Sequence, residues 1–402
     1  MKKITVAVTF IFYLSGCLSQ GSQKTYLDKY YTGKRIIVIM FDGFGMSYFN
    51  NSSHPNIDRM IKEGMLTKVK ALMPTVTNCN NVSICAGTFP EENGITGNSF
   101  LDTGGHEEYM ESGSLVTAPN LFERLNQYHR NSALISSKKK TLGLLSKGTA
   151  IGLSPEVPDS EWVRLLGQPP SIYSAEINYW SMEAALYILK NRKEISCLYI
   201  HTTDYPMHTW SPGDTNSQKH IARIDQYIGE ISRAAPDAMI LITADHDVNH
   251  KSRCVDIEKS LDLKGAKIRI AISAERDKYL AHHRGFGGTS FVYLNNKADT
   301  VSIKNALLQI KGVKTVLTNN EAAKLYHLKT DRIGDLVVLA DSITVFGTID
   351  TPEEELPDTY RTHGSEYEID VPLMIFNASK RPDPAYFSYN KDLVRWLFEQ
   401  VE

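Results

Sequence analysis

Four short apolar runs constrain the fold of this 402-residue chain more than any other feature. They are RIIVIMFDG (35–43), CLYIHTTD (197–204), AMILITADHD (238–247) and VPLMIFN (371–377). Continuous runs of this length, rich in β-branched residues, are typical of strands buried on both faces of a parallel sheet. Helical patterns lie between the runs, at 54–65 and 217–235, and follow the last one at 391–400. Strands that alternate with helices predict a doubly wound, mostly parallel α/β sheet.

Residues 255–355 follow a different pattern. Short strand-like segments such as KIRIAIS, SFVYLNN and DLVVLAD alternate there with short helical segments such as IKNALLQI and NEAAKLYHL. This composition predicts an α+β cap subdomain inserted into the sheet domain. The catalytic domain would then consist of residues 35–254 and 356–402.

The first residues have the pattern of a targeting segment. Two lysines precede the apolar stretch ITVAVTFIFYL, which is short for a transmembrane helix. It ends in LSGC (14–17), which resembles a bacterial lipobox, so we expect cleavage before Cys17 and lipidation of its thiol. Residues 1–17 would form the signal peptide and 18–34 a polar tether. The predicted location is the bacterial cell envelope, on the periplasmic or outer-membrane face. Cleavage elsewhere, or a retained anchor, is the alternative.

Charge and cysteine content exclude other classes. The formal net charge is −2, so electrostatics gives no reason to expect a nucleic-acid partner. The cysteines after Cys17 match neither a C-x-x-C motif nor a dense disulfide framework, and most are expected to be buried.

Acidic residues and histidines gather where the predicted strands end and in the loops that follow. They are Asp42, Asp204, His208, Asp245, His246 and His363. Singly, a strand-end Asp is often a helix N-cap and a lone His is more often a satisfied core or surface residue. Together they fall at the carboxyl edge of one sheet, where ligands bind. Mixed carboxylate and imidazole ligands suit Zn²⁺, and also Mn²⁺ or Fe. Six ligands are too many for one tetrahedral site with an open position for substrate, so we expect two metal ions.

PTVTNCNN (74–81) offers a nucleophile. Its threonines and asparagines could simply cap a helix. The chemical alternative is that Thr77 attacks a phosphorus centre, because paired ions about 3.5–4 Å apart activate oxygen nucleophiles in phosphoryl transfer. Two divalent ions against three carboxylates leave a charge of about +1, which favours an anionic substrate.

The ordered set FDG, PTVTNCNN, GNSF, DYPMH, TADHD and THG resembles the alkaline phosphatase superfamily. The resemblance runs from about residue 35 to 395, within the branch that holds nucleotide pyrophosphatase/phosphodiesterases and phosphonoacetate hydrolase. It implies that one zinc is held by Asp42, Thr77, Asp245 and His246, with Thr77 as the nucleophile. It implies that the other is held by Asp204, His208 and His363. Asn98 would donate a hydrogen bond to a phosphoryl oxygen.

Two segments favour the phosphonoacetate hydrolase side of this branch. MPTVTNCNN is closer to its pattern than to that of the diesterases, and SSKKKTLGLLSKG (136–148) is similar to its Lys-x-Lys segment. The resemblance implies that Lys138 and Lys140 bind the substrate carboxylate; a solvated basic turn is the ordinary interpretation. The predicted activity is cleavage of the P–C bond of phosphonoacetate to phosphate and acetate through a phosphothreonine.

Two other functions stay open. A nucleotide pyrophosphatase or phosphodiesterase would use the same metals and Thr77, with Tyr205 and Trp210 as candidates to stack a base. A non-catalytic binding lipoprotein would have lost a ligand or the nucleophile, and none is missing. The chain departs from the family pattern at Cys79 (usually Pro), at Asp247 (usually Gly) and in THGS, without loss of a predicted ligand.

Overall fold

The computed structural model describes residues 24–30, 34–278 and 282–399. The predicted signal peptide and Cys17 lie outside the described residues. Part of the predicted tether is described: Tyr26–Tyr30 form helix α1, and the ring of Tyr26 packs 4.0 Å from that of Trp396 in α15 (Asp392–Phe398). This part of the segment therefore packs on the sheet domain through Tyr26.

Within the described residues, seven strands form the main sheet, in the order β2-β18-β8-β1-β7-β5-β6. Their bounds are Met65–Lys70, Asp370–Phe376, Met239–Thr243, Ile36–Met40, Ile195–His201, Asn131–Ser136 and Ile151–Leu153. Strands β8, β1, β7, β5 and β6 are parallel neighbours, whereas β18 runs antiparallel to both β8 and β2. Strands β1 and β8 are buried at every position, as their continuous apolar runs predict.

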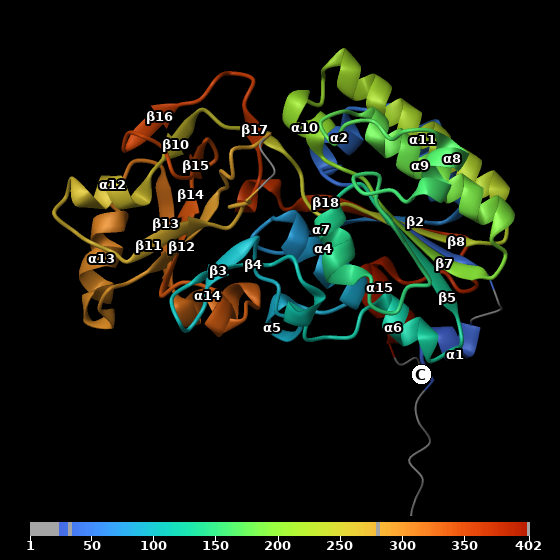
Figure 1. Cartoon of the computed structure of the whole chain (residues 1–402), viewed down its shortest axis with the longest axis horizontal. Coiled ribbons are helices and arrows are strands. Elements are labelled where there is room, and N and C mark those ends of the chain that lie inside the picture. The colour runs from blue at the N-terminus through green and yellow to red at the C-terminus, as the bar shows by residue number, and fades with distance from the viewer. Residues whose placement is uncertain (1–23, 31–33, 279–281, 400–402) are drawn as a thin grey trace, which may run out of the picture.

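Helices cover both faces of this sheet (Figure 1). One layer contains α2, α3, α8, α9, α10 and α11, which span Met46–Asn50, Pro55–Glu63, Ser160–Leu166, Glu176–Asn191, Tyr205–Thr209 and Thr215–Ala234. The other contains α4, α5, α6, α7 and α15, of which the first four span Thr77–Ala86, Pro90–Asn93, Leu121–Asn126 and Lys139–Leu145. The predicted doubly wound, mostly parallel α/β fold is confirmed.

Residues 253–355 build a second lobe beside the sheet domain (Figure 1). Its four-stranded antiparallel sheet has the order β11-β12-β14-β13, with bounds Ile270–Ser273, Thr289–Tyr293, Leu336–Ala340 and Val313–Thr318. Helices α12, α13 and α14 span Ile257–Asp262, Thr300–Leu307 and Asn319–Tyr326. A smaller sheet pairs β15 (Thr344–Phe346), β10 (Arg253–Val255) and β16 (Glu353–Glu355).

Two short antiparallel pairs complete the described strands. Strand β3 (Ser99–Leu101) pairs with β4 (Glu107–Tyr109), and β9 (Asn249–His250) pairs with β17 (Arg361–Thr362). Across the described ranges, no helix has both the length and the apolar character needed to cross a bilayer.

Candidate active site

The site lies at the carboxyl edge of the parallel strands. Neighbouring strands β8, β1, β7 and β5 are followed within four residues by Asp245, Asp42, Asp204 and Lys138, respectively. Since parallel strands end at the same edge of a sheet, four charged side chains distant in sequence meet there. All four are buried.

Thr77 is the first residue of α4, and its hydroxyl points into this cluster. The N-cap position is Val76, and no side chain caps the helix, so the interpretation of Thr77 as a capping residue is wrong. Thr77 Oγ1 lies 3.3 Å from His246 Nε2. The segment is held by Asn80, whose carboxamide accepts from the Leu72 N–H at 2.7 Å and donates to the Leu72 carbonyl at 3.0 Å. Asn80 of PTVTNCNN thus fixes the backbone that leads to the nucleophile candidate.

The first Asp–His cluster joins Asp42, Asp245 and His246. His246 Nε2 lies 3.6 Å from Asp42 Oδ1 and 3.3 Å from Asp245 Oδ2. Among the described residues, no hydrogen-bond donor reaches either of these two carboxylate oxygens. Buried carboxylate oxygens without donors are costly, and a cation between them would remove that cost.

The second cluster joins Asp204, His208 and His363. Asp204 Oδ2 lies 2.8 Å from His208 Nε2 and 3.4 Å from His363 Nε2. The two clusters adjoin, because the His246 and His363 rings stack with their centroids 3.6 Å apart. The structure therefore brings together all six predicted Asp and His ligands and Thr77.

The three histidines share one orientation that suits metal binding. Their Nδ1 atoms face backbone carbonyls: His208 faces that of Arg361 at 2.6 Å, His246 that of Asp247 at 3.0 Å and His363 that of Thr75 at 2.7 Å. A proton held on Nδ1 leaves the Nε2 lone pair directed into the cluster. Lone pairs that face carboxylates fit a cation, so the residues present suit divalent metals.

Electrostatics within the first cluster points the same way. Burial and the neighbouring Asp42 carboxylate raise the pKa of Asp245 well above its usual range. Burial, together with His363, lowers the pKa of His246 to about 3, so that its imidazole is neutral at physiological pH. Two closely spaced carboxylates beside a neutral imidazole are stable only with a bound proton or cation.

Lys138 and Lys140 both form ion pairs inside the protein. Lys138 Nζ lies 2.8 Å from Asp42 Oδ2 and 2.9 Å from Asp204 Oδ1, so its ammonium group bridges the two Asp–His clusters. Lys140 Nζ lies 2.6 Å from Asp277 Oδ2 in the second lobe. The sequence interpretation as a solvated basic turn is wrong for these two side chains, since each is only 3% exposed. If Lys138 and Lys140 bind the substrate carboxylate, as the resemblance implies, each must do so while it is also paired with an internal carboxylate.

Asn98 and the aromatic candidates lie around these clusters. Asn98 is buried, and its Nδ2 donates to Glu275 Oε2 at 3.1 Å. Tyr205 begins α10 directly after Asp204. Its ring centroid lies 6.0 Å from that of Tyr173 and 5.9 Å from that of His282. Trp210 directly follows the same helix and takes no part in these ring contacts.

Three residues near the clusters escaped the sequence prediction: His201 and Glu275, which are buried, and His282, which is partly buried. His201 Nε2 lies 3.1 Å from Asp42 Oδ2, and Glu275 Oε1 lies 2.9 Å from His363 Nδ1. His282 Nε2 lies 3.9 Å from Asp204 Oδ1, and among the described residues neither of its ring nitrogens has a hydrogen-bond partner. The position of His201 at the end of an apolar strand could have identified it from the sequence. Glu275 and His282 reach the clusters only because the second lobe packs against the sheet domain.

The departures from the family pattern have local explanations. The Asp247 carboxylate accepts from the Ser47 N–H at 2.8 Å and from its hydroxyl at 2.6 Å, and Asp247 does not adopt a positive φ. In THGS, Gly364 keeps a φ of +101°, and a Cβ there would lie 2.8 Å from the Gly288 backbone nitrogen. Cys79 is fully buried among apolar residues.

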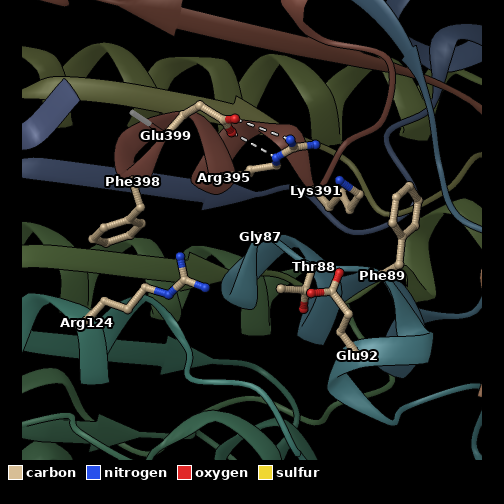
Figure 2. A pocket seen from close by; sticks show the side chains of 9 residues that line it. All are labelled: Gly87, Thr88, Phe89, Glu92, Arg124, Lys391, Arg395, Phe398 and Glu399. Atoms are coloured by element: carbon tan, nitrogen blue, oxygen red, sulfur yellow. Dashed lines mark hydrogen bonds and ion pairs between the residues drawn. The ribbon is translucent and has the colours of Figure 1, made fainter. Parts of the chain in front are cut away.

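A cavity of about 480 Å³ lies elsewhere, at the C-terminal end of α4 (Figure 2). Arg124 stacks over Phe398 at 5.1 Å, and Lys391 lies over Phe89 at 4.1 Å. None of the predicted site residues lines this cavity. The candidate active site is therefore defined by the Asp–His clusters at the other end of α4.

Comparisons with known proteins agree with this architecture. Phosphonoacetate hydrolase from Sinorhizobium meliloti 1021, solved with phosphonoformate, is 26% identical, with a TM-score of 0.81 over 90% of this chain and 95% of that one. Murine ectonucleotide pyrophosphatase/phosphodiesterase 5 shares the fold, with a TM-score of 0.67 at 15% identity over 92% of this chain and 96% of that one. Bovine bis(5'-adenosyl)-triphosphatase ENPP4 is 23% identical over 65% of this chain and 56% of its own length. The chain thus spans about half the length of that curated relative.

The sheet and the paired Asp–His clusters at its carboxyl edge are those of the alkaline phosphatase superfamily, which confirms the resemblance seen in the sequence. Within it, the chain belongs to the type I phosphodiesterase / nucleotide pyrophosphatase family, whose pattern residues 36–366 match.

Proposed function

We propose that the protein is a two-metal hydrolase that cleaves the P–C bond of phosphonoacetate, releasing phosphate and acetate through a phosphorylated Thr77. The observation that carries the proposal is the position of the Thr77 hydroxyl, 3.3 Å from His246 in the first Asp–His cluster and beside the second. The likeness to a phosphonoacetate hydrolase over nine-tenths of both chains supports this substrate over others.

The residues present divide into two sets that would hold metal ions. Asp42, Thr77, Asp245 and His246 would form one set, and Asp204, His208 and His363 the other. Bound divalent ions, Zn²⁺ first and Mn²⁺ or Fe as alternatives, would supply the positive charge that phosphoryl transfer requires.

The chain's own residues account for the chemical steps. The Thr77 oxygen, after loss of its proton, forms a bond to phosphorus while the P–C bond breaks. The electron pair of that bond moves into the acetate group, is shared with its carboxylate, and then takes up a proton. Water hydrolyses phospho-Thr77 in a second step, so one difficult displacement becomes two easier ones. The Asn98 amide would donate to the phosphoryl oxygens as negative charge develops.

Lys138 would serve this reaction from its place between the clusters. Its ammonium group compensates Asp42 and Asp204 and places a buried positive charge between the two Asp–His clusters. A leaving group that spreads its charge into a carboxylate benefits from such a cation.

A phosphodiesterase or nucleotide pyrophosphatase is the second candidate. Tyr173, Tyr205 and His282 place three rings within 6.0 Å of one another beside Asp204. Such a group could contact a flat leaving group, and related proteins are named for nucleotide substrates.

Phosphate release by zinc-loaded protein comprising residues 18–402 tests the proposal. Phosphonoacetate and an aryl phosphodiester would be compared at equal concentration, the second through its released alcohol. We expect preference for phosphonoacetate, with loss of turnover in Thr77→Ala and a large decrease in Lys138→Ala/Lys140→Ala. Cleavage of the diester alone would contradict the substrate and retain the metal site and Thr77.

We further propose that the mature chain is attached to the bacterial envelope through a lipid on Cys17, because LSGC directly follows the apolar stretch. The full chain expressed in a bacterium should fractionate with membranes, and a Cys17→Ala variant should not acquire lipid. A full-length protein whose Cys17 carries no lipid would contradict this proposal.

A further inference from the structure

Glu275 reaches from the second lobe into the candidate active site. It follows β11 by two residues, and its side chain is buried. One carboxylate oxygen, Oε1, lies 2.9 Å from His363 Nδ1, and the other, Oε2, accepts from Asn98 Nδ2 at 3.1 Å. A single carboxylate thus contacts one predicted metal ligand and the predicted phosphoryl-oxygen donor.

The contact with Asn98 fixes which end of its amide faces the site. A carboxylate can only accept, so the NH₂ group of Asn98 must point toward Glu275. The backbone supports this arrangement, since the Asn98 N–H donates to the carbonyl of Ala274 at 2.9 Å. Two successive residues of the second lobe therefore hold Asn98, and one N–H of its amide stays available for a substrate oxygen.

The contact with His363 acts on the opposite side of the ring from the cluster. His363 Nδ1 lies between the Thr75 carbonyl, at 2.7 Å, and Glu275 Oε1. The Thr75 carbonyl accepts the hydrogen bond from Nδ1, and the negative charge of Glu275 beside it favours a proton on Nδ1, which leaves Nε2 directed at Asp204. The space that Glu275 occupies depends on Gly287, where an added Cβ would lie 2.7 Å from the Glu275 Cγ.

We propose that Glu275 is a positioning residue that sets Asn98 and His363 together, and that the second lobe therefore forms part of the catalytic machinery. The inference rests on the proposed function only in the roles it gives to those two residues. Glu275 touches neither the nucleophile nor the reacting atoms in this arrangement. It acts through the amide orientation of Asn98 and the ring orientation of His363.

Glu275→Gln is the most direct test, because glutamine has nearly the same shape but only one accepting oxygen. If that oxygen accepts from Asn98, the glutamine NH₂ faces the Nδ1 proton of His363. If it accepts from His363, the NH₂ faces Asn98 and favours a reversed amide. We expect kcat to decrease about 10- to 100-fold, with a smaller change in KM, and zinc affinity to weaken about 10-fold in competition with a chromophoric chelator.

Glu107→Gln is the matched control. Glu107 Oε1 contacts the Ser99 hydroxyl at 2.9 Å and Arg276 at 3.1 Å, so it lies at the same junction between the lobes without touching either positioned residue. Its replacement should leave kcat and zinc affinity within about twofold of wild type, because rim ion pairs contribute little. Gly287→Ala, which crowds Glu275 without removing its charge, should reproduce the decrease in kcat.

The coupling to Asn98 is measured with Asn98→Ala alone and combined with Glu275→Gln. We expect the two effects on kcat to be strongly less than multiplicative, because both remove the same donor. Fully multiplicative effects would overturn the coupling. A folded Glu275→Gln protein with wild-type kcat and zinc affinity would overturn the whole inference, as would a decrease in thermal stability alone. Zinc affinity needs no substrate, so a wrong substrate assignment would not obscure this result.

Discussion

The ammonium nitrogen of Lys138 lies 2.8 Å from Asp42 Oδ2, and both side chains are buried. The same nitrogen lies 2.9 Å from Asp204 Oδ1 in the other Asp–His cluster. Burial and the Asp204 charge oppose ionisation of Asp42, yet Lys138 and His201 lower the pKa of Asp42 below its usual range. Lys138 therefore favours the ionised form of Asp42 and Asp204, one carboxylate from each cluster, and holds the two side chains together.

Removal of Lys138 should destabilise the metal-free protein more than the zinc-loaded protein. Lys138→Ala removes the ammonium group that compensates two buried carboxylates, a loss on the order of 3–5 kcal/mol in the free energy of unfolding. Zinc should recover much of this loss, because cations at the clusters compensate the same carboxylates. Urea unfolding with chelator and with zinc measures both values. Lys140→Ala, which breaks the pair with Asp277, provides the comparison without a change at the clusters.

An equal loss of stability with and without zinc would contradict this role for Lys138. So would a Lys138→Ala protein whose metal-free stability matches that of wild type and whose only change is a higher KM for phosphonoacetate. That second result would indicate that Lys138 acts in substrate binding alone.

The stability of the sheet domain should depend on pH through His220 in α11. Burial lowers the pKa of His220 to about 3, against an ordinary value of 6.5, and its Nδ1 lies 3.1 Å from the Tyr179 hydroxyl. Between these two pH values the unfolded chain binds the proton and the folded protein does not. The contribution of His220 is therefore complete above about pH 6.5 and is lost as the pH falls toward 3.

Unfolding of wild type and His220→Gln between about pH 7 and pH 4 measures this term. Relative to the variant, wild type should lose roughly 1.4 kcal/mol per pH unit below about pH 6.5, which amounts to about 3 kcal/mol at pH 4. Identical pH dependence in the two proteins would show that His220 is solvated in the native state.

The four cysteines beyond residue 17 should be unreactive in the folded protein. Cys79, Cys85, Cys197 and Cys254 are free and buried, and burial raises the pKa of each thiol well above its usual range. Since the thiolate is the reactive form, an alkylating reagent should modify none of them in native protein lacking residues 1–17, and all four after unfolding. Fast modification of Cys79 in the native state would instead indicate a thiol exposed beside Thr77.

The strand-end residues could be predicted because each lies directly after the apolar run that forms its strand. In RIIVIMFDG and AMILITADHD, the apolar run specifies the strand, and the residues that follow reach the edge where parallel strands end. Thr77 followed from its place at the start of a polar helix near the same edge. These inferences need no knowledge of which strands are neighbours.

The partners of those residues could not be predicted in the same way. Lys138 lies between the clusters because β5 pairs with β7. The order of strands in a sheet cannot be inferred from any single sequence segment. Glu275 and His282 reach the clusters only because the second lobe docks against the sheet domain. Their segments, ISAERD and HHRG, carry no periodicity that marks an active site.

The covalent role of Thr77 is tested most directly by stopping turnover with acid and mapping phosphate on the digested protein. Zinc-loaded protein mixed with phosphonoacetate should carry phosphate on the peptide that contains Thr77, and Thr77→Ala should bind zinc yet show neither phosphopeptide nor turnover. Sustained turnover by Thr77→Ala, or phosphate release by wild type with no phosphorylated Thr77 at any time, would contradict the account.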